Sequence, residues 1–304
     1  MARRWTAADI PDLTGTTAVV TGANTGLGKE TARELARAGA SVELACRDEV
    51  KGRAALDEIA ADVPGADLRV QRLDVASLAS VRAAAEELRG RHDKIDLLVN
   101  NAGVMYVPRS LTEDGFELQM GTNHLGHFAL TGLLLDRVLA APAGRVVAVS
   151  SVAHKIRSKI DFDDLTFERG YDKVAAYGRS KLANLYFTYR LDALLRAAGA
   201  PAMALAGHPG VSDTELVRNS PAPLRAGARL GAFALNSAAV GALATLRAAT
   251  DPDARGSEFF GPSGPGEAVG HPVRVLSTSR SHRGDLQRRL WDASTELTGV
   301  EFSL

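Results

Sequence analysis

The stretch VVTGANTGLG, residues 19–28, decides the fold, because it joins an apolar run to a helical pattern through a turn with three glycines. TTAVVTG (16–22) predicts a buried strand, and GLGKETARELARAG (26–39) predicts a helix that ends at Gly39. Such glycines let the backbone approach a pyrophosphate, and the helix N-terminus offers free N–H groups. The spacing G-x-x-x-G-x-G is neither the commonest dinucleotide fingerprint nor a P-loop, and a plain strand-to-helix turn is the alternative.

The same alternation of apolar runs and helical patterns continues along the chain. Further strands are predicted at 41–47, 68–75, 95–103, 144–151 and 202–210. Further helices are predicted up to about residue 61 and at 78–90, 112–140 and 173–198. Nearly all the strands are apolar, as in sheets that are covered on both faces. The pattern therefore predicts an α/β fold of Rossmann type, with a doubly wound parallel sheet.

We expect one domain over residues 1–304, with a cofactor-binding and catalytic core at 14–210 and a substrate lid and C-terminal segment at 211–304. Pro, Gly and Ser become frequent after residue 210, which indicates loops over a site. The apolar stretch 230–246 is interpreted as a packed helix or a substrate lid, since it is shorter than the ~20 apolar residues of a membrane span.

Composition excludes several classes of function. The chain has 304 residues, with 36 basic and 36 acidic side chains, so no basic field favours a nucleic-acid partner. The single cysteine, Cys46, excludes an intrachain disulfide and a cysteine metal cluster, and it favours a cytoplasmic setting. The N-terminus lacks the apolar run of a signal peptide or anchor. We expect no metal site, and His124, His127, His154 and His208 are interpreted as structural or pocket-lining.

A tyrosine and a lysine lie four positions apart in AAYGRSKLANLYF, residues 175–187. On a helix such residues share a face, so the side chains of Tyr177 and Lys181 can converge. A Lys⁺ beside a phenol lowers its pKa toward neutral and makes a proton donor and acceptor. The alternative is a surface lysine beside a half-buried tyrosine.

The end of the second predicted strand bears on the choice of cofactor. Many dinucleotide sites hold the ribose 2′-hydroxyl with an acid about 20 residues after the glycine turn. Here Cys46 lies at that distance from Gly26 and Arg47 follows it, which suits a 2′-phosphate. We therefore expect NADP(H) in preference to NAD(H), although Asp48 is adjacent and Arg47 could be a solvated strand end.

With the glycine turn and Tyr177-x-x-x-Lys181, the sequence resembles the short-chain dehydrogenase/reductase family over about residues 14–215. Further motifs follow in the family order: Asn100-Asn101-Ala102-Gly103, Asn123, Ser151, Pro209-Gly210 and Thr214. The segments NNAGVMYVP, ACRD, NHLGHF and FFGPSGPGEAVGHP look like the branch of retinol dehydrogenase, WW-domain oxidoreductase and protochlorophyllide reductase.

The resemblance implies a set of catalytic residues. Tyr177 would exchange a proton with the substrate oxygen, and Ser151 would hydrogen-bond that oxygen, although Ser150 adjoins it. Lys181 would bind the nicotinamide ribose and lower the pKa of the phenol, and Asn123 would hold a water of the proton relay. The implied cofactor-binding residues are Gly22, Asn24, Thr25, Gly26, Leu27, Gly28, Arg47, Asp74, Val75, Asn101, Ala102, Gly103, Tyr177, Lys181, Pro209, Gly210 and Thr214.

The expected function is an NADP(H)-dependent oxidoreductase that interconverts a carbonyl and an alcohol of a small molecule. A catalytically silent NADP(H)-binding sensor or scaffold is the alternative, and a sugar-nucleotide epimerase is a third hypothesis, for which the C-terminal part looks too small.

Ser151 and Tyr177 are 26 positions apart, which indicates an insertion. Five apolar residues of the extra loops are predicted to line a partly apolar pocket: Phe162, Phe167, Tyr171, Leu216 and Leu224. The chain could also form a homo-oligomer.

Overall fold

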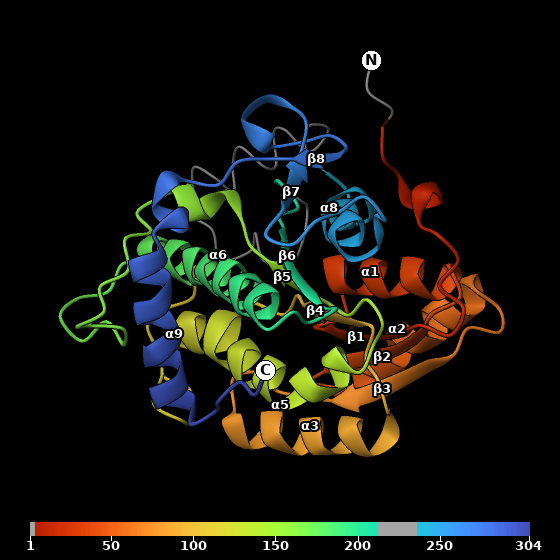
Figure 1. Cartoon of the computed structure of the whole chain (residues 1–304), viewed down its shortest axis with the longest axis horizontal. Coiled ribbons are helices and arrows are strands. Elements are labelled where there is room, and N and C mark those ends of the chain that lie inside the picture. Colours follow the sequence, from red (N-terminus) through yellow and green to blue (C-terminus); the bar gives the residue numbers. More distant parts are fainter. Residues whose placement is uncertain (1–3, 212–235) are drawn as a thin grey trace.

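The computed structural model describes residues 4–211 and 236–304, which form an eight-stranded sheet with helices on both faces (Figure 1). The strand order is β3-β2-β1-β4-β5-β6-β7-β8, and every neighbouring pair is parallel except β7 and β8. The strands are β1 Thr17–Thr21, β2 Ser41–Cys46, β3 Leu68–Arg72, β4 Leu97–Asn100, β5 Arg145–Val149, β6 Met203–Gly207, β7 Phe259–Pro262 and β8 Pro272–Arg274. The predicted Rossmann-type fold is therefore confirmed.

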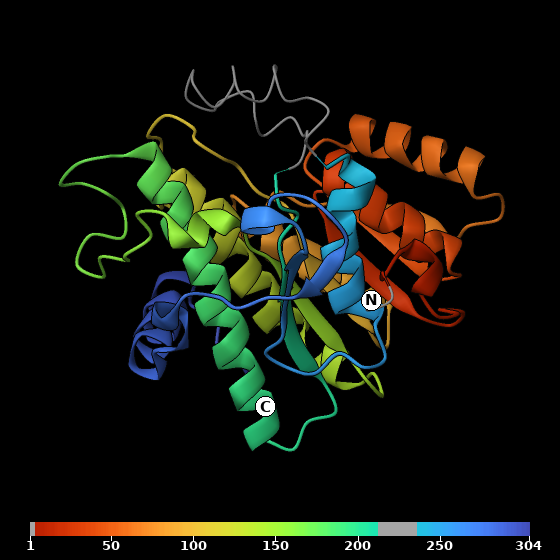
Figure 2. The ribbon, with the colours of Figure 1, turned by 90° about the horizontal axis from the view of Figure 1, so that it is seen from above.

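Helices cover both faces because successive strand residues point to opposite sides. Val20 packs in the core beneath α1 and α8, whereas its neighbour Val19 packs beneath α3 and α5. The long helix α6 lies on the same face as α3 and α5, and α9 packs on α6 (Figure 2). The helices are α1 Gly26–Arg37, α2 Glu49–Asp62, α3 Leu78–Arg91, α4 Leu118–Met120, α5 Gly126–Leu139, α6 Lys173–Ala197, α8 Ala238–Thr250 and α9 Gly284–Thr298.

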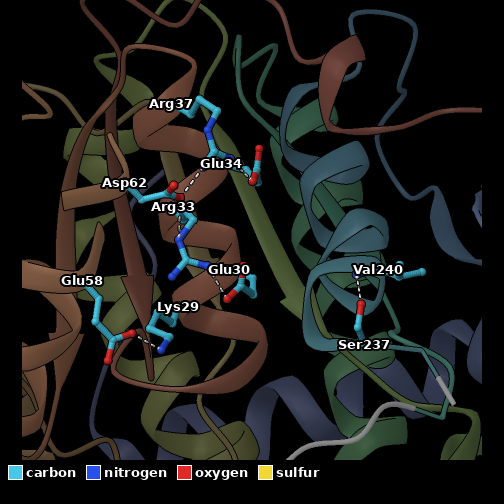
Figure 3. Close-up of polar contacts among 9 residues, drawn as sticks. All are labelled: Lys29, Glu30, Arg33, Glu34, Arg37, Glu58, Asp62, Ser237 and Val240. Atoms are coloured by element: carbon cyan, nitrogen blue, oxygen red, sulfur yellow. Dashed lines mark hydrogen bonds and ion pairs between the residues drawn. The ribbon is translucent and has the colours of Figure 1, made fainter. Parts of the chain in front are cut away.

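Ion pairs join α1 to α2 on the surface of the molecule (Figure 3). Lys29 contacts Glu58 at 2.5 Å, and Arg33 and Arg37 both contact Asp62, at 3.3 and 2.5 Å. These side chains are partly or largely exposed, so each pair contributes only ~0–1 kcal/mol to stability. The apolar packing of α1 against the sheet and α8 is the larger contribution.

The described part of the C-terminal region differs from the loops expected there. It contains α8 and α9 and adds two strands to the sheet, but β7 and β8 have four and three residues and are too short to show a periodicity. The stretch 230–246 is described from residue 236, and its residues from Ala238 lie in α8, packed against α1. Among the described residues, no helix has the length and apolarity needed to cross a bilayer.

The helix predicted at 112–140 begins later and is interrupted. Thr112 and Phe116 close a turn, since the Thr112 N–H donates to the Phe116 carbonyl at 2.8 Å, and α4 begins only at Leu118. A π-helical turn, Gly121–Leu125, then separates α4 from α5. π turns are frequent at functional sites because they break the regular hydrogen-bond ladder and redirect side chains.

We predict that Gly126→Ala destabilises the fold. A Cβ atom at Gly126 would lie 1.9 Å from the carbonyl oxygen of Val75, so α5 would have to move away from the end of β3. Such overpacking costs about 1–3 kcal/mol or more. Urea unfolding measures the loss. The control is Gly90→Ala in α3, where no atom lies within 4 Å of the added Cβ and a gain of about 0.4–1 kcal/mol is expected. Equal effects of the two substitutions would contradict the prediction.

Candidate active site

A cleft of about 420 Å³ opens at the carboxyl ends of the strands. The strand order reverses between β1 and β4, and in open α/β sheets ligands bind at such a switch point. Fifteen of the residues predicted to bind cofactor line the cleft: Gly22, Asn24, Thr25, Gly26, Leu27, Gly28, Arg47, Asp74, Val75, Asn101, Ala102, Gly103, Tyr177, Lys181 and Pro209. Asn123, Ser151 and Gly210 do not line it, and Thr214 lies outside the described residues.

The glycine turn packs too closely for larger residues. Gly22 and Gly26 have φ angles of 67° and 54°, in the left-handed region that favours glycine. A Cβ atom at Gly28 would lie 2.3 Å from the Gly22 carbonyl oxygen and 2.5 Å from the Asn101 side-chain nitrogen. The turn therefore brings the first strand, the first helix and the loop after β4 into direct contact.

The N-terminus of α1 fits the phosphates of a dinucleotide. Its N-cap, Thr25, makes no side-chain cap bond, and the first turn contains no acid. By contrast, the side chain of Asp48 caps α2 by accepting from the Lys51 N–H, and α3, α6 and α8 also have side-chain caps. The first N–H groups of α1 are thus left for a bound anion, on which the helix dipole acts favourably.

The hydroxyl of Thr21 joins three parts of the site. It accepts hydrogen bonds from the backbone N–H groups of Asn101 and Ala102, both at 2.9 Å, and lies 2.8 Å from His127 Nε2. Because the Asn123 carbonyl can only accept, His127 Nδ1 donates to it at 3.2 Å, and Nε2 is then an acceptor for the Thr21 proton, which also has the Val99 carbonyl at 3.4 Å. Burial lowers the pKa of His127 to about 4, so the ring is neutral.

Tyr177 and Lys181 lie in the buried first half of α6. Asp172 caps this helix by accepting from the N–H groups of Val174 and Ala175, at 2.8 and 3.1 Å. Lys181 Nζ donates to the Val149 carbonyl at 2.9 Å and lies 5.7 Å from the centre of the Tyr177 ring. The two groups therefore converge beside the cleft, as their spacing predicts.

The electrostatics of this pair differ from the expectation that Lys181 lowers the pKa of Tyr177. Burial raises the pKa of Tyr177 above its ordinary value, and a hydrogen bond with Ser151 acts in the opposite direction. Burial also lowers the pKa of Lys181 to about 8, because the ammonium is removed from water. The ammonium is held by a backbone carbonyl beside the ring face, and burial is the largest influence on the pKa of the phenol.

The two adjacent serines have different partners. Ser150 is buried and its hydroxyl donates to the Lys181 carbonyl at 2.8 Å, which fixes α6 to the end of β5. Ser151 is near enough to the Tyr177 hydroxyl to lower the pKa of the phenol, and it accepts from the Ala153 N–H at 3.2 Å. This arrangement supports the choice of Ser151 over Ser150 as the partner of Tyr177, although Ser150 also lines the cleft.

Asn123 lies fully buried in the π-helical turn and holds the loop after β4. Its side-chain oxygen accepts from the Val104 N–H at 2.8 Å, and its nitrogen donates to the Val104 carbonyl at 3.0 Å and to Ser180 at 2.9 Å. A Cβ atom at Gly103 would lie 3.0 Å from the Asn123 side-chain oxygen and 3.6 Å from Lys181 Nζ. The side chain of Asn123 therefore fixes the backbone of the loop. Its predicted role in a proton relay stays a prediction.

Two cationic side chains line the cleft at the end of β2. Arg47 is exposed and lies 3.8 Å from Asp74, and Lys51 in the first turn of α2 lines the same cleft. Sequence reasoning missed Lys51, for which the signal was a second cation at the start of the helix that follows Arg47. Asp48 is occupied as the cap of α2. Cys46 is buried against Gly52, and burial raises the pKa of its thiol to about 11, so it is a packing residue.

A model of the short chain dehydrogenase family matches residues 16–224. The chain belongs to this family. It is 43% identical over 288 residues to retinol dehydrogenase 12 of Mus musculus, with 95% of this chain and 88% of the relative covered. A crystal structure of a Mycobacterium paratuberculosis protein without an assigned function has a TM-score of 0.83 and 43% identity, and covers 99% of this chain and 100% of the other.

A third comparison concerns a cofactor complex. A Beutenbergia cavernae protein, assigned as an NAD(P)-dependent gluconate 5-dehydrogenase and solved with NADP, has a TM-score of 0.61 and 28% identity, and covers 79% of this chain and 91% of the other. The family and the similarity to retinol dehydrogenases identify the chain as an NAD(P)-dependent oxidoreductase that acts on CH–OH groups. The resemblance in the sequence motifs is thereby confirmed.

The insertion between Ser151 and Tyr177 packs on the family scaffold. Phe167 contacts Tyr171 edge to face, and Arg179 stacks over the Phe167 ring at 4.3 Å. None of Phe162, Phe167 and Tyr171 lines the 420 Å³ cleft, whereas Met105, Val104 and Val107 of the loop after β4 do. Leu216 and Leu224 lie outside the described residues. In the described part of the chain, the loop after β4 thus contributes apolar lining to the cleft, together with Leu27, Leu73, Val75 and Val149.

The buried histidines predict that acid weakens this fold. Burial lowers the pKa of His124 to about 3 and those of His127 and His208 to about 4, whereas an unfolded chain protonates histidine near 6.5. Unfolding therefore takes up protons below pH 6.5, and the stability that is present above that pH is lost as the pH falls toward 4. Each residue contributes up to about 1.4 kcal/mol per pH unit in this window.

Urea unfolding at pH 7.5 and 5.0 measures this dependence. The free energy of unfolding is expected to be lower at pH 5.0, with more than one proton taken up. His282→Gln, which removes an exposed histidine, should leave the difference unchanged. An equal free energy of unfolding at the two pH values would show that the three buried rings do not resist protonation.

Proposed function

We propose that the protein is an NADP(H)-dependent oxidoreductase that interconverts a carbonyl compound and an alcohol, with Tyr177 as general acid and base. The observation that carries this proposal is the position of Tyr177: it lines the same cleft as the glycine turn, and Lys181 Nζ lies 5.7 Å from the centre of its ring. A catalytically silent cofactor sensor would not need Ser151, Tyr177 and Lys181, so the presence of all three favours an enzyme. A cytoplasmic location is proposed with it, on composition alone.

The residues divide the chemistry between them. NADPH, when bound, supplies the hydride for reduction of the carbonyl carbon. Ser151 and Tyr177 hold the carbonyl oxygen with two hydrogen bonds, and the Tyr177 hydroxyl gives its proton to that oxygen as negative charge develops there. In the direction of oxidation, the tyrosine takes the alcohol proton. A neutral phenol near pH 7 suits the donor role, and burial favours this neutral form.

Lys181 is the residue that connects proton transfer to cofactor binding. Its ammonium sits beside Tyr177 and Gly103 at the cleft wall. With a pKa of about 8, it is charged near neutral pH and would donate to the hydroxyls of the nicotinamide ribose. Binding of these hydroxyls would add acceptors to a buried cation that has few and would stabilise its charged form.

The cleft suits an alcohol or aldehyde with an apolar body. Val104, Met105 and Val107 line it, and Met105 packs against the cluster that contains Tyr177. Asn123 holds the backbone of this loop at Val104. Retinol dehydrogenase 12 of Mus musculus, a relative at 43% identity, is named for an alcohol of this kind. The proposed substrate class is therefore small to medium apolar alcohols and carbonyl compounds.

Preference for NADP(H) is supported by the charge at the end of β2. Arg47 and Lys51 both line the cleft there, whereas Asp48 does not line it, although it caps α2 and lies 3.7 Å from Lys51 Nζ. Two cations favour a 2′-phosphate through charge-assisted hydrogen bonds. Asp74 also lines this end and forms a long ion pair with Arg47, and a phosphate would compete with it for the guanidinium.

We predict that Tyr177→Phe lowers kcat by about 10²–10⁴-fold, because the proton donor is removed while the ring is kept. The Kd for NADPH should change little. Tyr186→Phe is the matched control, since Tyr186 is buried on the same helix and does not line the cleft. Assays of carbonyl reduction by NADPH absorbance give both values. Near wild-type turnover in Tyr177→Phe would remove the tyrosine from the mechanism, and a wild-type protein that binds NADPH but turns over no carbonyl or alcohol would favour the silent sensor.

We predict that Arg47→Asp shifts the preference from NADPH toward NADH by about tenfold or more, because a charge-assisted hydrogen bond contributes about 1.5–3 kcal/mol. The ratio of kcat/KM for the two cofactors is the measurement. Arg53→Asp makes the same charge change at an exposed residue of α2 outside the cleft and should leave the ratio unchanged. The same shift in both variants would mean that the overall charge of this surface sets the preference for NADPH, and that a direct contact with Arg47 does not.

A further inference from the structure

Tyr106 has a backbone conformation that bulky residues rarely adopt. Its φ is 55°, in the left-handed region, although it is an aromatic residue in the loop after β4. Such conformations persist where the surrounding structure fixes them, and they concentrate at functional sites. The backbone N–H of Tyr106 donates to the side-chain oxygen of Gln119 at 2.8 Å, which is one cause of this conformation.

The loop that carries Tyr106 is held at three successive points. Asn123 binds both backbone groups of Val104, Gln119 binds the N–H of Tyr106, and the hydroxyl of Tyr171 donates to the Val107 carbonyl at 2.9 Å. The side chains that hold the loop are also bonded to one another, because Gln119 donates to the Tyr171 hydroxyl at 2.9 Å. Gln119 is fully buried, so its hydrogen bonds are shielded from competition by water.

The result of this backbone is that the Tyr106 ring lies against Tyr177. The ring centres are 5.2 Å apart at an angle of 73°, an edge-to-face contact that aromatic pairs favour. Both side chains are buried, and Ala153, Met105 and Val174 complete the cluster. Met105 and Val107 line the cleft but Tyr106 does not, so its ring supports Tyr177 from outside the cleft.

We propose that Tyr106 is a positioning residue, whose ring is held by the strained loop so that the Tyr177 hydroxyl stays at Ser151. The proposal rests on the proposed function, since it assigns a support to the proton donor of that reaction. Tyr177 can rotate about two side-chain bonds, and the other described neighbours of its ring are Lys181 Nζ, 5.7 Å from its centre, and the small or flexible side chains of Ala153, Val174 and Met105. The edge-to-face contact with Tyr106 restrains the remaining rotation of the ring.

Loss of this support is expected to act on turnover. A displacement of about 1 Å of a catalytic group can reduce a rate by about 10²-fold. Tyr106→Leu keeps an apolar side chain but removes the aromatic edge, so kcat should fall by about 10–100-fold. Tyr106→Phe keeps the ring and should retain kcat within about threefold. The Kd for NADPH should stay within about twofold in both variants, because Tyr106 does not line the cleft.

The experiment compares full-length wild type, Tyr106→Phe, Tyr106→Leu and Tyr106→Met for kcat, KM, Kd for NADPH and Tm. Methionine is flexible and fills irregular space, so it provides a second ring-less variant if leucine does not fold. The expected result is a lower kcat in the ring-less variants with an unchanged Kd, and rescue by phenylalanine. A role in stability alone would lower Tm and leave kcat of the folded protein unchanged.

Three results would overturn the proposal. A kcat within twofold of wild type in the ring-less variants would show that the contact is not needed. An equal loss in Tyr106→Phe would assign the effect to the hydroxyl, and a parallel loss of NADPH binding would assign it to collapse of the loop. Failure of the proposed function is distinguishable, because Tyr177→Phe would then retain turnover whatever the behaviour of the Tyr106 variants.

Discussion

The site depends on the hydroxyl of Thr21, where three segments that are distant in the sequence meet. Two backbone N–H groups of the loop after β4 donate to its oxygen, and it also hydrogen-bonds Nε2 of His127 in α5. Without this acceptor the N–H group of Ala102 would lose its described partner, whereas that of Asn101 would keep the Val99 carbonyl at 3.0 Å; an unsatisfied buried donor costs ~1–3 kcal/mol. The hydroxyl thus keeps the glycine turn beside the loop after β4, and through His127 it reaches the carbonyl of Asn123.

A second constraint is the burial of the Lys181 ammonium at the end of β5. Val149 offers its carbonyl to Lys181 and also accepts from Asn184, one turn further along α6. A buried cation with one backbone acceptor is incompletely satisfied, and its lowered pKa is the consequence. The ribose hydroxyls of a bound cofactor would supply further acceptors to this ammonium. Cofactor binding and protonation of Lys181 would therefore favour each other.

The sequence predicted the sheet and the identity of the cleft residues better than the way those residues interact. Apolar runs such as Val19-Val20 identify parallel strands because both faces are covered, and the ordered motifs locate Tyr177 and Lys181. The link between Thr21 and His127 spans 106 positions and has no local signal. The spacing also led to the expectation that Lys181 lowers the pKa of Tyr177, whereas that pKa is raised, because spacing on a helix says nothing about burial, which dominates the pKa of both groups.

The residues around the cleft show why amides and hydroxyls are frequent in its motifs. Loops at the carboxyl ends of strands leave backbone groups without ladder partners, and these groups must be satisfied when they are buried. Asn101 donates to the Thr21 carbonyl, Asn123 binds Val104 twice, and Ser150 binds Lys181. Part of what resembles a catalytic set is therefore the framework that holds the loops still. Tyr177 differs from these residues in that it lines the cleft and the described hydrogen bonds do not tie its hydroxyl to a loop, which supports its proposed role as the group that meets a substrate.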